Sequence, residues 1–93
     1  MLIGTAQIEL FIPGSHSLKE KRFILKSIKA RIQNQFNVSI AEVDFHDKWQ
    51  RSCLGVACIS NERKHAEKII DNILRFIERD NRLEIIDQAV EIL

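Results

Sequence analysis

The sequence is poor in the residue types that most often identify a catalytic or cofactor-binding motif. Its 93 residues include three glycines, one proline, two cysteines, one tryptophan and no tyrosine. The scattered glycines form no glycine-rich phosphate loop, and no G-x-S-x-G or H-E-x-x-H motif is present. Two cysteines are too few for an iron–sulfur cluster. These absences exclude the enzyme classes that such motifs define.

The sequence also gives no sign of a disulfide or a membrane segment. Cys53 and Cys58 lie in one apolar run at an odd spacing, so a strand would point them to opposite faces. They then form neither a bridge with each other nor a CxxC metal pair, and they fit small apolar residues in a reduced compartment. The sequence has no signal-peptide pattern and no run of about 18 apolar residues. We therefore expect a cytoplasmic protein without membrane contact.

The length predicts a single domain over residues 1–93 with a small hydrophobic core. Dimerisation would stabilise so small a core, so a homodimer is expected. The net charge of +1 shows no overall bias toward nucleic acid. The distribution is uneven, because residues 18–36 hold six bases and one acid, whereas residues 83–93 hold three acids and no base. Such asymmetry can steer a polyanion to one side of a small domain.

Two kinds of hydrophobic periodicity alternate along the chain. Strict alternation at the N-terminus is typical of a strand covered on one face, and Pro13-Gly14 ends it with a turn. Apolar residues at helical spacing, such as Leu25, Ile28 and Ile32, indicate amphipathic helices. In chain order, we expect a strand over 1–12, a helix over 17–36, strands over 37–45 and 52–60, a helix over 61–80 and a strand over 81–93.

This β-α-β-β-α-β order predicts an α+β, ferredoxin-like sandwich, in which an antiparallel sheet carries both helices on one face. Gly55 and Ala57 share one face of their strand, and such small residues favour close cover by a helix. RNA-recognition motifs bind RNA on the surface of their sheet, and this mode of binding needs aromatic residues on the two central strands. The first strand offers only Phe11 and the strand over 52–60 offers none, so that mode is disfavoured.

The start of the first helix is a candidate anion-binding site. Ser17 and Glu20 have the spacing of a capping box. Backbone amides point outward at a helix N-terminus, and each cation placed there costs about 0.3–1 kcal/mol. A bound phosphate or nucleic-acid backbone would explain the cations, whereas a solvated basic turn balanced by Glu20 is the alternative. The candidate anion- or nucleic-acid-binding residues are Ser17, Lys19, Lys21, Arg22, Lys26 and Lys29.

An acidic cluster with a histidine follows in the stretch "AEVDFHDKWQR". On an extended strand Glu42, Asp44 and His46 share a face. Two carboxylates and an imidazole could hold a divalent metal or support acid–base chemistry. Alternatively, the three residues crowd the solvent end of a hairpin and offset nearby cations. We assign no catalytic residue, metal ligand or cofactor.

The same stretch contains the single tryptophan. Trp49 beside Arg51 could stack on a base or pack against a partner. Alternatively, Trp49 folds over the end of the core, and Arg51 pairs with Asp44 or Asp47. The candidate hairpin contact surface consists of Glu42, Asp47, Trp49, Gln50 and Arg51.

Four stretches of the chain carry a family resemblance: "SLKEKR", "FNVSIAEVD", "D-x-WQR" and "LGVACISN". Together they resemble the YlxP-like family of small bacterial proteins of unknown function, and the resemblance covers nearly the whole chain. It implies a ferredoxin-like fold and a cytoplasmic protein. Genes of this family often lie among translation and ribosome-maturation genes, which implies an accessory role near the ribosome or RNA. The resemblance assigns no catalytic residue, and it leaves Asp44 and His46 at variable positions. Its pattern carries over to Ser17, Leu18, Lys19, Glu20, Lys21, Arg22, Glu42, Val43, Asp47, Trp49, Gln50 and Arg51.

Three hypotheses follow for the function. The first is a non-enzymatic, dimeric binding module for ribosomal RNA or the small ribosomal subunit, with phosphate contacts from the first helix. The second is a dimeric protein-interaction module that binds no nucleic acid. The third is a small metal-dependent enzyme that uses the cluster over residues 42–47.

Overall fold

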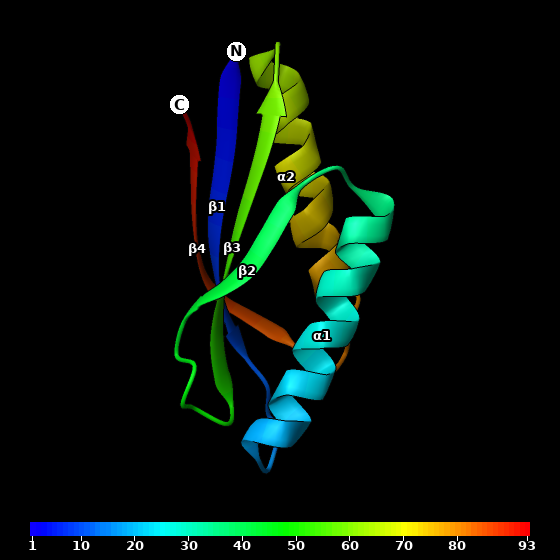
Figure 1. Ribbon diagram of the computed structural model, residues 1–93, viewed down its shortest axis with the longest axis vertical. Coiled ribbons are helices and arrows are strands. Elements are labelled where there is room, and N and C mark those ends of the chain that lie inside the picture. The colour runs from blue at the N-terminus through cyan, green and yellow to red at the C-terminus, as the bar shows by residue number, and fades with distance from the viewer.

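The computed structural model describes all residues, 1–93, and has the predicted β-α-β-β-α-β order (Figure 1). Each observed element lies within three residues of its expected bounds. In chain order the elements are β1 (Leu2–Phe11), α1 (Leu18–Gln35), β2 (Ser39–Asp44), β3 (Arg51–Ser60), α2 (Arg63–Glu78) and β4 (Glu84–Ile92).

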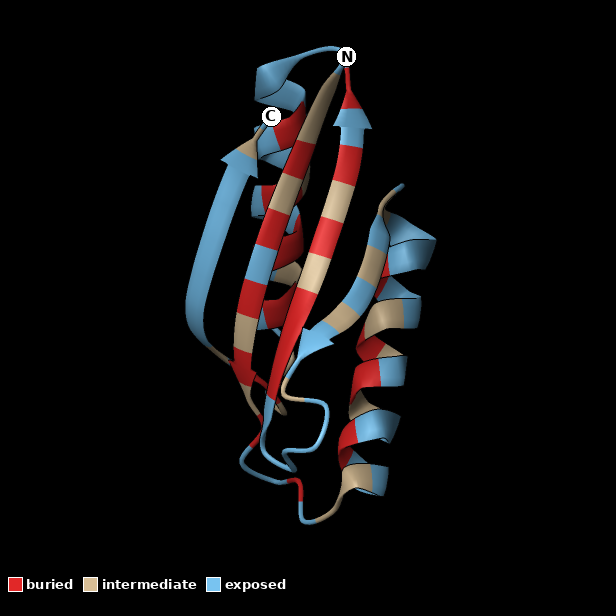
Figure 2. Cartoon of the chain, turned by 60° about the vertical axis from the view of Figure 1, so that its left-hand side comes forward, coloured by how far each residue is buried: buried red, intermediate tan, exposed pale blue.

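The four strands form one antiparallel sheet in the order β2-β3-β1-β4. The two central strands pair along their whole length, from Leu2 opposite Ser60 to Phe11 opposite Arg51. Both helices cover the same face of this sheet, and no helix lies over the other face (Figures 1 and 2). The predicted ferredoxin-like arrangement is therefore confirmed. No helix combines the length and the apolar character that crossing a membrane requires.

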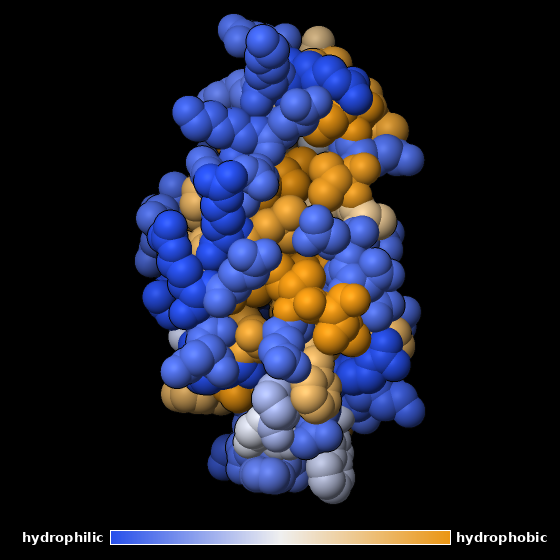
Figure 3. Space-filling model, turned by 180° about the vertical axis from the view of Figure 1, so that it is seen from behind, coloured by the Kyte–Doolittle hydropathy of each residue, from blue (hydrophilic) through white to orange (hydrophobic).

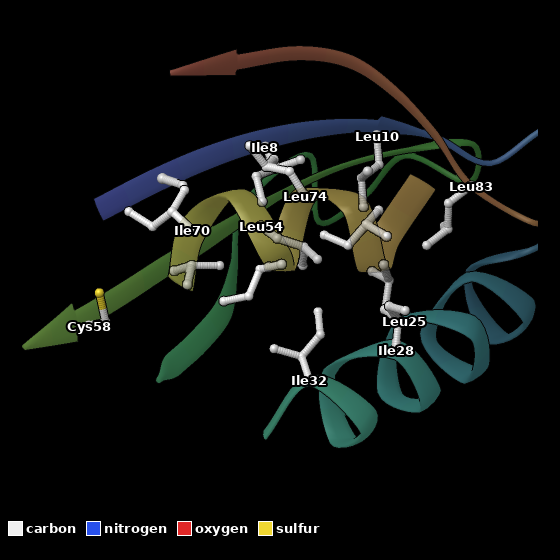
Figure 4. Packing of buried hydrophobic residues seen from close by; sticks show 14 of the residues in the cluster. Ile8, Leu10, Leu25, Ile28, Ile32, Leu54, Cys58, Ile70, Leu74 and Leu83 are labelled. Atoms are coloured by element: carbon white, nitrogen blue, oxygen red, sulfur yellow. The ribbon is translucent and has the colours of Figure 1, made fainter. Parts of the chain in front are cut away.

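The core lies between the sheet and the helix layer. Alternate residues of the first strand point into it, and Ile8 and Leu10 are fully buried. Side chains from the sheet and from both helices point toward one another there (Figure 4). Fully burying a Leu or Ile side chain contributes about 1.5–3 kcal/mol, so this layer is the main source of stability. The helices contribute Leu25, Ile28 and Ile32 from α1, and Ala66, Ile70, Ile73, Leu74 and Ile77 from α2.

The predicted capping box at the start of α1 is confirmed. Ser17 Oγ accepts a hydrogen bond from the Glu20 amide at 3.1 Å. The Glu20 carboxylate reaches back to the amide of His16, at 2.8 Å, rather than to that of Ser17. One amide that the helix itself leaves unpaired and one amide that precedes the helix are thereby satisfied.

We call the helix-free side of the sheet the open face. Its central part comes from alternate residues of β1 and β3, which their pairing places side by side. Its residues are Ile3, Thr5, Gln7, Glu9, Phe11, Arg51, Cys53, Gly55, Ala57 and Ile59 on the central strands, with Ser39, Ala41, Asp44, Glu84, Asp87, Ala89, Glu91 and Leu93 beside them.

The small residues of β3 lie on the opposite side from the one predicted. Gly55 and Ala57 belong to the open face, because Leu54 and Val56 point into the helix-covered core. A Cβ at Gly55 would lie 2.8 Å from Val43 Cγ1, so this glycine makes room for a neighbouring strand's side chain. The alternation was predicted correctly, but it did not reveal which side the helices cover.

The glycine that a helix covers closely is Gly4, on β1. A Cβ there would lie 3.0 Å from Ile70 Cδ1 and 3.3 Å from Ala66 Cβ, both on α2. The absence of a side chain therefore sets how closely α2 approaches the sheet.

The edge strand β4 is largely exposed, and its apolar residues Ile86 and Val90 are accessible to solvent. Seen from behind, apolar side chains gather in a band along the long axis, bordered by hydrophilic ones (Figure 3). The molecule thus retains uncovered apolar surface outside its core.

Gly4→Ala is expected to lower the free energy of unfolding by about 1–3 kcal/mol, because an added methyl group must displace packed atoms. Urea unfolding followed by circular dichroism measures the change. Gly14→Ala is the matched control, since a Cβ at Gly14 has no atom within 4 Å. Equal stability of the two variants would contradict the close packing of α2 on Gly4.

Candidate functional site

Lys21 lies in the first turn of α1, and its side chain is completely buried, with 0% of its surface exposed. Its ammonium Nζ donates to the carbonyl oxygens of Phe45 at 2.7 Å, His46 at 3.3 Å and Arg51 at 3.3 Å. It also forms an ion pair with Glu42 Oε2 at 3.0 Å. A buried charge is tolerated only with such a full set of partners.

Glu42 completes this internal network from strand β2. The same oxygen, Oε2, accepts a hydrogen bond from Ser52 Oγ at 2.6 Å, and the Glu42 side chain is only 14% exposed. The network joins α1 to β2, to β3 and to the loop between these strands. No buried side-chain nitrogen or oxygen of the structure lacks a hydrogen-bond partner.

Two sequence predictions are corrected by this arrangement. Lys21 cannot contact a phosphate at the surface, because its ammonium group is enclosed by the protein. Glu42 is likewise an internal residue rather than part of the hairpin contact surface. The signal for Lys21 was present, since positions 21, 25, 28 and 32 share one side of the helix and the last three are apolar core residues.

The acidic cluster with the histidine does not converge. A register shift lies between Glu42, which pairs with Leu54, and Asp44, which pairs with Cys53. Successive residues of β3 face opposite sides, so the two carboxylates point to different faces. His46 Nε2 lies 3.1 Å from the backbone oxygen of Glu42. The predicted shared face is therefore wrong, and no group of three or more His, Cys, Asp or Glu residues could hold a metal ion.

The loop owes its shape to an unusual backbone at Phe45. Its φ angle is 61°, a left-handed conformation that a bulky residue rarely adopts. The Lys21 ammonium binds the Phe45 carbonyl oxygen, and Arg51 Cζ lies 4.3 Å from the centre of the Phe45 ring. These contacts hold the chain in a conformation that local preference disfavours.

The remaining hairpin residues are all exposed, but two of them, Gln50 and Arg51, contact other parts of the molecule. Gln50 Nε2 donates to the carbonyl oxygens of Pro13, at 3.2 Å, and Ser15, at 3.3 Å. Arg51 Nη2 pairs with Glu9 Oε2 at 3.0 Å, so it pairs with neither Asp44 nor Asp47.

Gln50 and Arg51 therefore attach the hairpin to the rest of the molecule. Trp49 is 56% exposed, so it does not fold over the end of the core. Asp47 is also exposed. These two residues remain as candidates for an external contact.

Four of the five other basic residues of α1 differ from Lys21 in having no ion-pair partner. Lys19, Arg22, Lys26 and Lys29 recur at intervals of three and four residues, which places them on one flank of the helix. We call these four residues the basic stripe. None of them forms an ion pair with a carboxylate.

A second group of cations lies between α1 and α2. Arg31, Arg79 and Arg82 line a hollow of about 500 Å³ together with Asp80. Arg82 Nη2 lies 2.7 Å from Asp80 Oδ2, and hydrogen bonding to this guanidinium lowers the pKa of Asp80. Arg31 approaches the same carboxylate at 3.7 Å and lies over the ring of Phe76. Arg31 and Arg82 are thus already paired within the molecule.

Neither cysteine is poised for chemistry. Cys53 and Cys58 are free and buried, and they point to opposite sides of β3 as predicted. Burial raises the pKa of the Cys53 thiol, and the nearby Glu9 carboxylate adds to this effect. A raised pKa leaves little of the nucleophilic thiolate near neutral pH.

These features define a small ferredoxin-like α+β protein with exposed basic and apolar surfaces. Residues 3–90 match the family described as "Protein of unknown function (DUF503)", and the chain belongs to this family. It is 45% identical over 83 residues to "Uncharacterized protein YlxP" of Bacillus subtilis (strain 168), covering 89% of this chain and 90% of that protein. The resemblance to YlxP-like proteins seen in the sequence is therefore confirmed.

A solved structure supports the fold. A de novo designed protein with a ferredoxin fold, determined by solution NMR, superposes with a TM-score of 0.57. The match covers 98% of this chain and 86% of the designed one at 20% sequence identity. At this identity, the likeness concerns the fold alone.

Lys21→Met is expected to lower the free energy of unfolding by about 3–5 kcal/mol, because it leaves the Glu42 carboxylate buried without its cation. The second change Glu42→Gln removes that charge and still accepts from Ser52, so the double variant should recover part of the loss. Urea unfolding measures both. Lys19→Met, on the exposed side of the same helical turn, is the control and should change stability by less than about 0.5 kcal/mol.

Proposed function

We propose that this protein is a non-enzymatic RNA-binding module of the cytoplasm, with ribosomal RNA as its expected target. The basic stripe contacts the phosphate backbone, and Trp49 stacks on a base. The observation that carries this proposal is the set of four unpaired cations along one flank of α1. The ribosomal target rests on the setting that resemblance to YlxP-like proteins implies.

The two helices differ in the pairing of their cations, although Lys64 and Lys68 of α2 also form no ion pair. On α2, Arg63 pairs with Glu67 and Arg75 pairs with Asp71, each four residues apart. Such pairs are the usual way in which a solvated helix neutralises its cations. The stripe on α1 has no such partners, and its four positions span roughly 15 Å along the helix axis. An extended polyanion supplies the missing negative charge over that length.

Trp49 is placed at one end of the stripe. The hairpin that carries it and the start of α1 lie at the same end of the molecule (Figure 1). Lys21 and Gln50 hold this hairpin against the helix start and the preceding loop. A tryptophan in a fixed position can stack on a base of any sequence, which suits binding without base-specific readout.

The open face of the sheet is less suited to RNA binding. Its only aromatic residue is Phe11, at the end of β1. Base stacking on the sheet needs aromatic residues on both central strands. The helix flank and the hairpin therefore suit RNA better than the sheet does.

The double variant Lys26→Glu/Lys29→Glu is expected to weaken binding to a fluorescently labelled single-stranded ribosomal RNA fragment by tenfold or more, as measured by anisotropy. Four phosphate contacts predict a slope of about −3 for log K against log salt, and losing two should roughly halve it. Lys64→Glu/Lys68→Glu on α2 makes the same charge change away from the stripe and should leave most of the binding intact. Equal losses in the two variants would indicate a general charge effect and would reject the stripe.

Trp49→Ala is expected to weaken RNA binding by about 1–3 kcal/mol, the usual contribution of one stacked base. The salt slope should stay unchanged, because no phosphate contact is lost. Trp49→Phe retains a ring and should keep most of the affinity. If Trp49→Ala binds as the wild type does, the stacking role is wrong even though the stripe remains.

A further inference from the structure

The open face carries a charge pattern that a solvated sheet face would not have. Its residues form five rows across the strands. The three rows nearest the chain termini contain one charged residue, Glu91, which lies on the edge strand β4. The last two rows contain Glu9, Asp44, Asp87, Glu84 and Arg51. A solvated face of an antiparallel sheet is normally polar along its whole length, so the first three rows fit cover by another surface.

Along the same three rows, large apolar side chains give way to small ones. The first row contains Ile3, Ile59 and Leu93, and the exposed fraction is 69% for Ile59 and 63% for Leu93. The third row contains Gly55, with Ala41 on one side of it and Ala89 beyond Gln7 on the other.

The small residues leave a hollow of about 500 Å³, bordered by Val43 and Leu93. Thr5 and Ala57 of the second row also line this hollow, so it adjoins the ridge of the first row.

We propose that a second copy of this chain covers these three rows and forms a two-fold symmetric dimer. The axis runs along the row of Thr5 and Ala57, in the plane of the contact. Rotation about this axis reverses the strands, so Ile59 of each copy packs on Val43 of the other, the side chain that covers Gly55. Leu93 of each copy likewise lies over Ala89 of the other. Such a self-complementary contact closes on itself, as a dimer interface requires.

The positions of the acidic residues favour this axis over one that runs parallel to the strands. With the axis parallel to the strands, β2 of each copy would lie over β4 of the other, so two Asp44–Asp87 pairs would form in the row that also contains Glu9. With the proposed axis, these acidic rows extend beyond the overlap at opposite ends of the dimer. Glu91 of one copy faces Glu91 of the other within the overlap, but this single pair of like charges lies at its solvent-exposed edge.

The size of the contact predicts a modest affinity. Three rows across four strands cover roughly 400 Å² of projected face in each copy. A standard interface buries about 800 Å² of accessible surface per partner, so this contact belongs to the smaller class of reversible interfaces. We expect a dimer that dissociates on dilution in the micromolar range.

This dimer does not depend on the proposed RNA binding. The helices lie on the far side of each sheet, so the basic stripes of both copies stay outside the contact (Figure 2). Experiments on RNA-free protein therefore test the dimer by itself.

Sedimentation velocity on pairs of charge variants tests the proposed axis. Ala57 of one copy faces Ala57 of the other, so Ala57→Glu and Ala57→Lys should each be monomeric at concentrations where the wild type is dimeric. An equimolar mixture of the two should form a heterodimer, because the introduced charges then have opposite signs. Restored dimerisation also shows that both variants fold.

Ala30→Glu is the matched control, because Ala30 is exposed on α1 and lies outside the contact. It should dimerise as the wild type does. Three results would overturn the proposal: a wild type that stays monomeric at high concentration, an Ala57→Glu variant that still dimerises, or folded single variants whose mixture stays monomeric. Thermal unfolding of each variant establishes that it is folded.

Discussion

The buried ammonium group of Lys21 is the interaction on which the arrangement of helix and hairpin depends. Lys21 belongs to the first turn of α1, yet its partners all lie on β2, β3 and the loop between them. Because a buried charge needs all of its partners at once, the helix start and the hairpin are stable only together. The same contact fixes the loop that carries Trp49, so an internal ion pair determines where this exposed side chain lies.

The sheet separates two surfaces with different chemistry. The helix layer carries the unpaired basic stripe, and the open face carries a ridge and a hollow of apolar residues. Together, the two proposals describe a dimer with basic stripes on opposite outer surfaces. An RNA that reaches both stripes would bind the second one at a high effective concentration, which raises the overall affinity without a new contact. A modest dimer and a modest RNA site would then reinforce each other.

Residue alternation and helical spacing were sufficient to predict the elements and their order, because both depend only on near neighbours in the chain. They also placed Cys53 and Cys58 on opposite faces correctly. The same alternation put Gly55 and Ala57 under a helix, because periodicity shows which residues share a face and not which face is covered. It also put Glu42 and Asp44 together, because a register shift and the positive φ of Phe45 leave no periodic signal.

The sequence by itself therefore determined the ferredoxin-like fold, the capping of α1 by Ser17 and the family to which the chain belongs. Only the tertiary structure decided which individual charged side chains are buried and which are exposed. Lys21 and Lys19 are two residues apart on one basic helix, yet one is enclosed and the other is exposed. The physical reason is distance along the chain. Helical spacing places Lys21 on the same side as the core residues of α1, but the carbonyl oxygens that accept hydrogen bonds from its ammonium group lie 24 to 30 residues away. The helix alone therefore does not show which groups satisfy the buried charge.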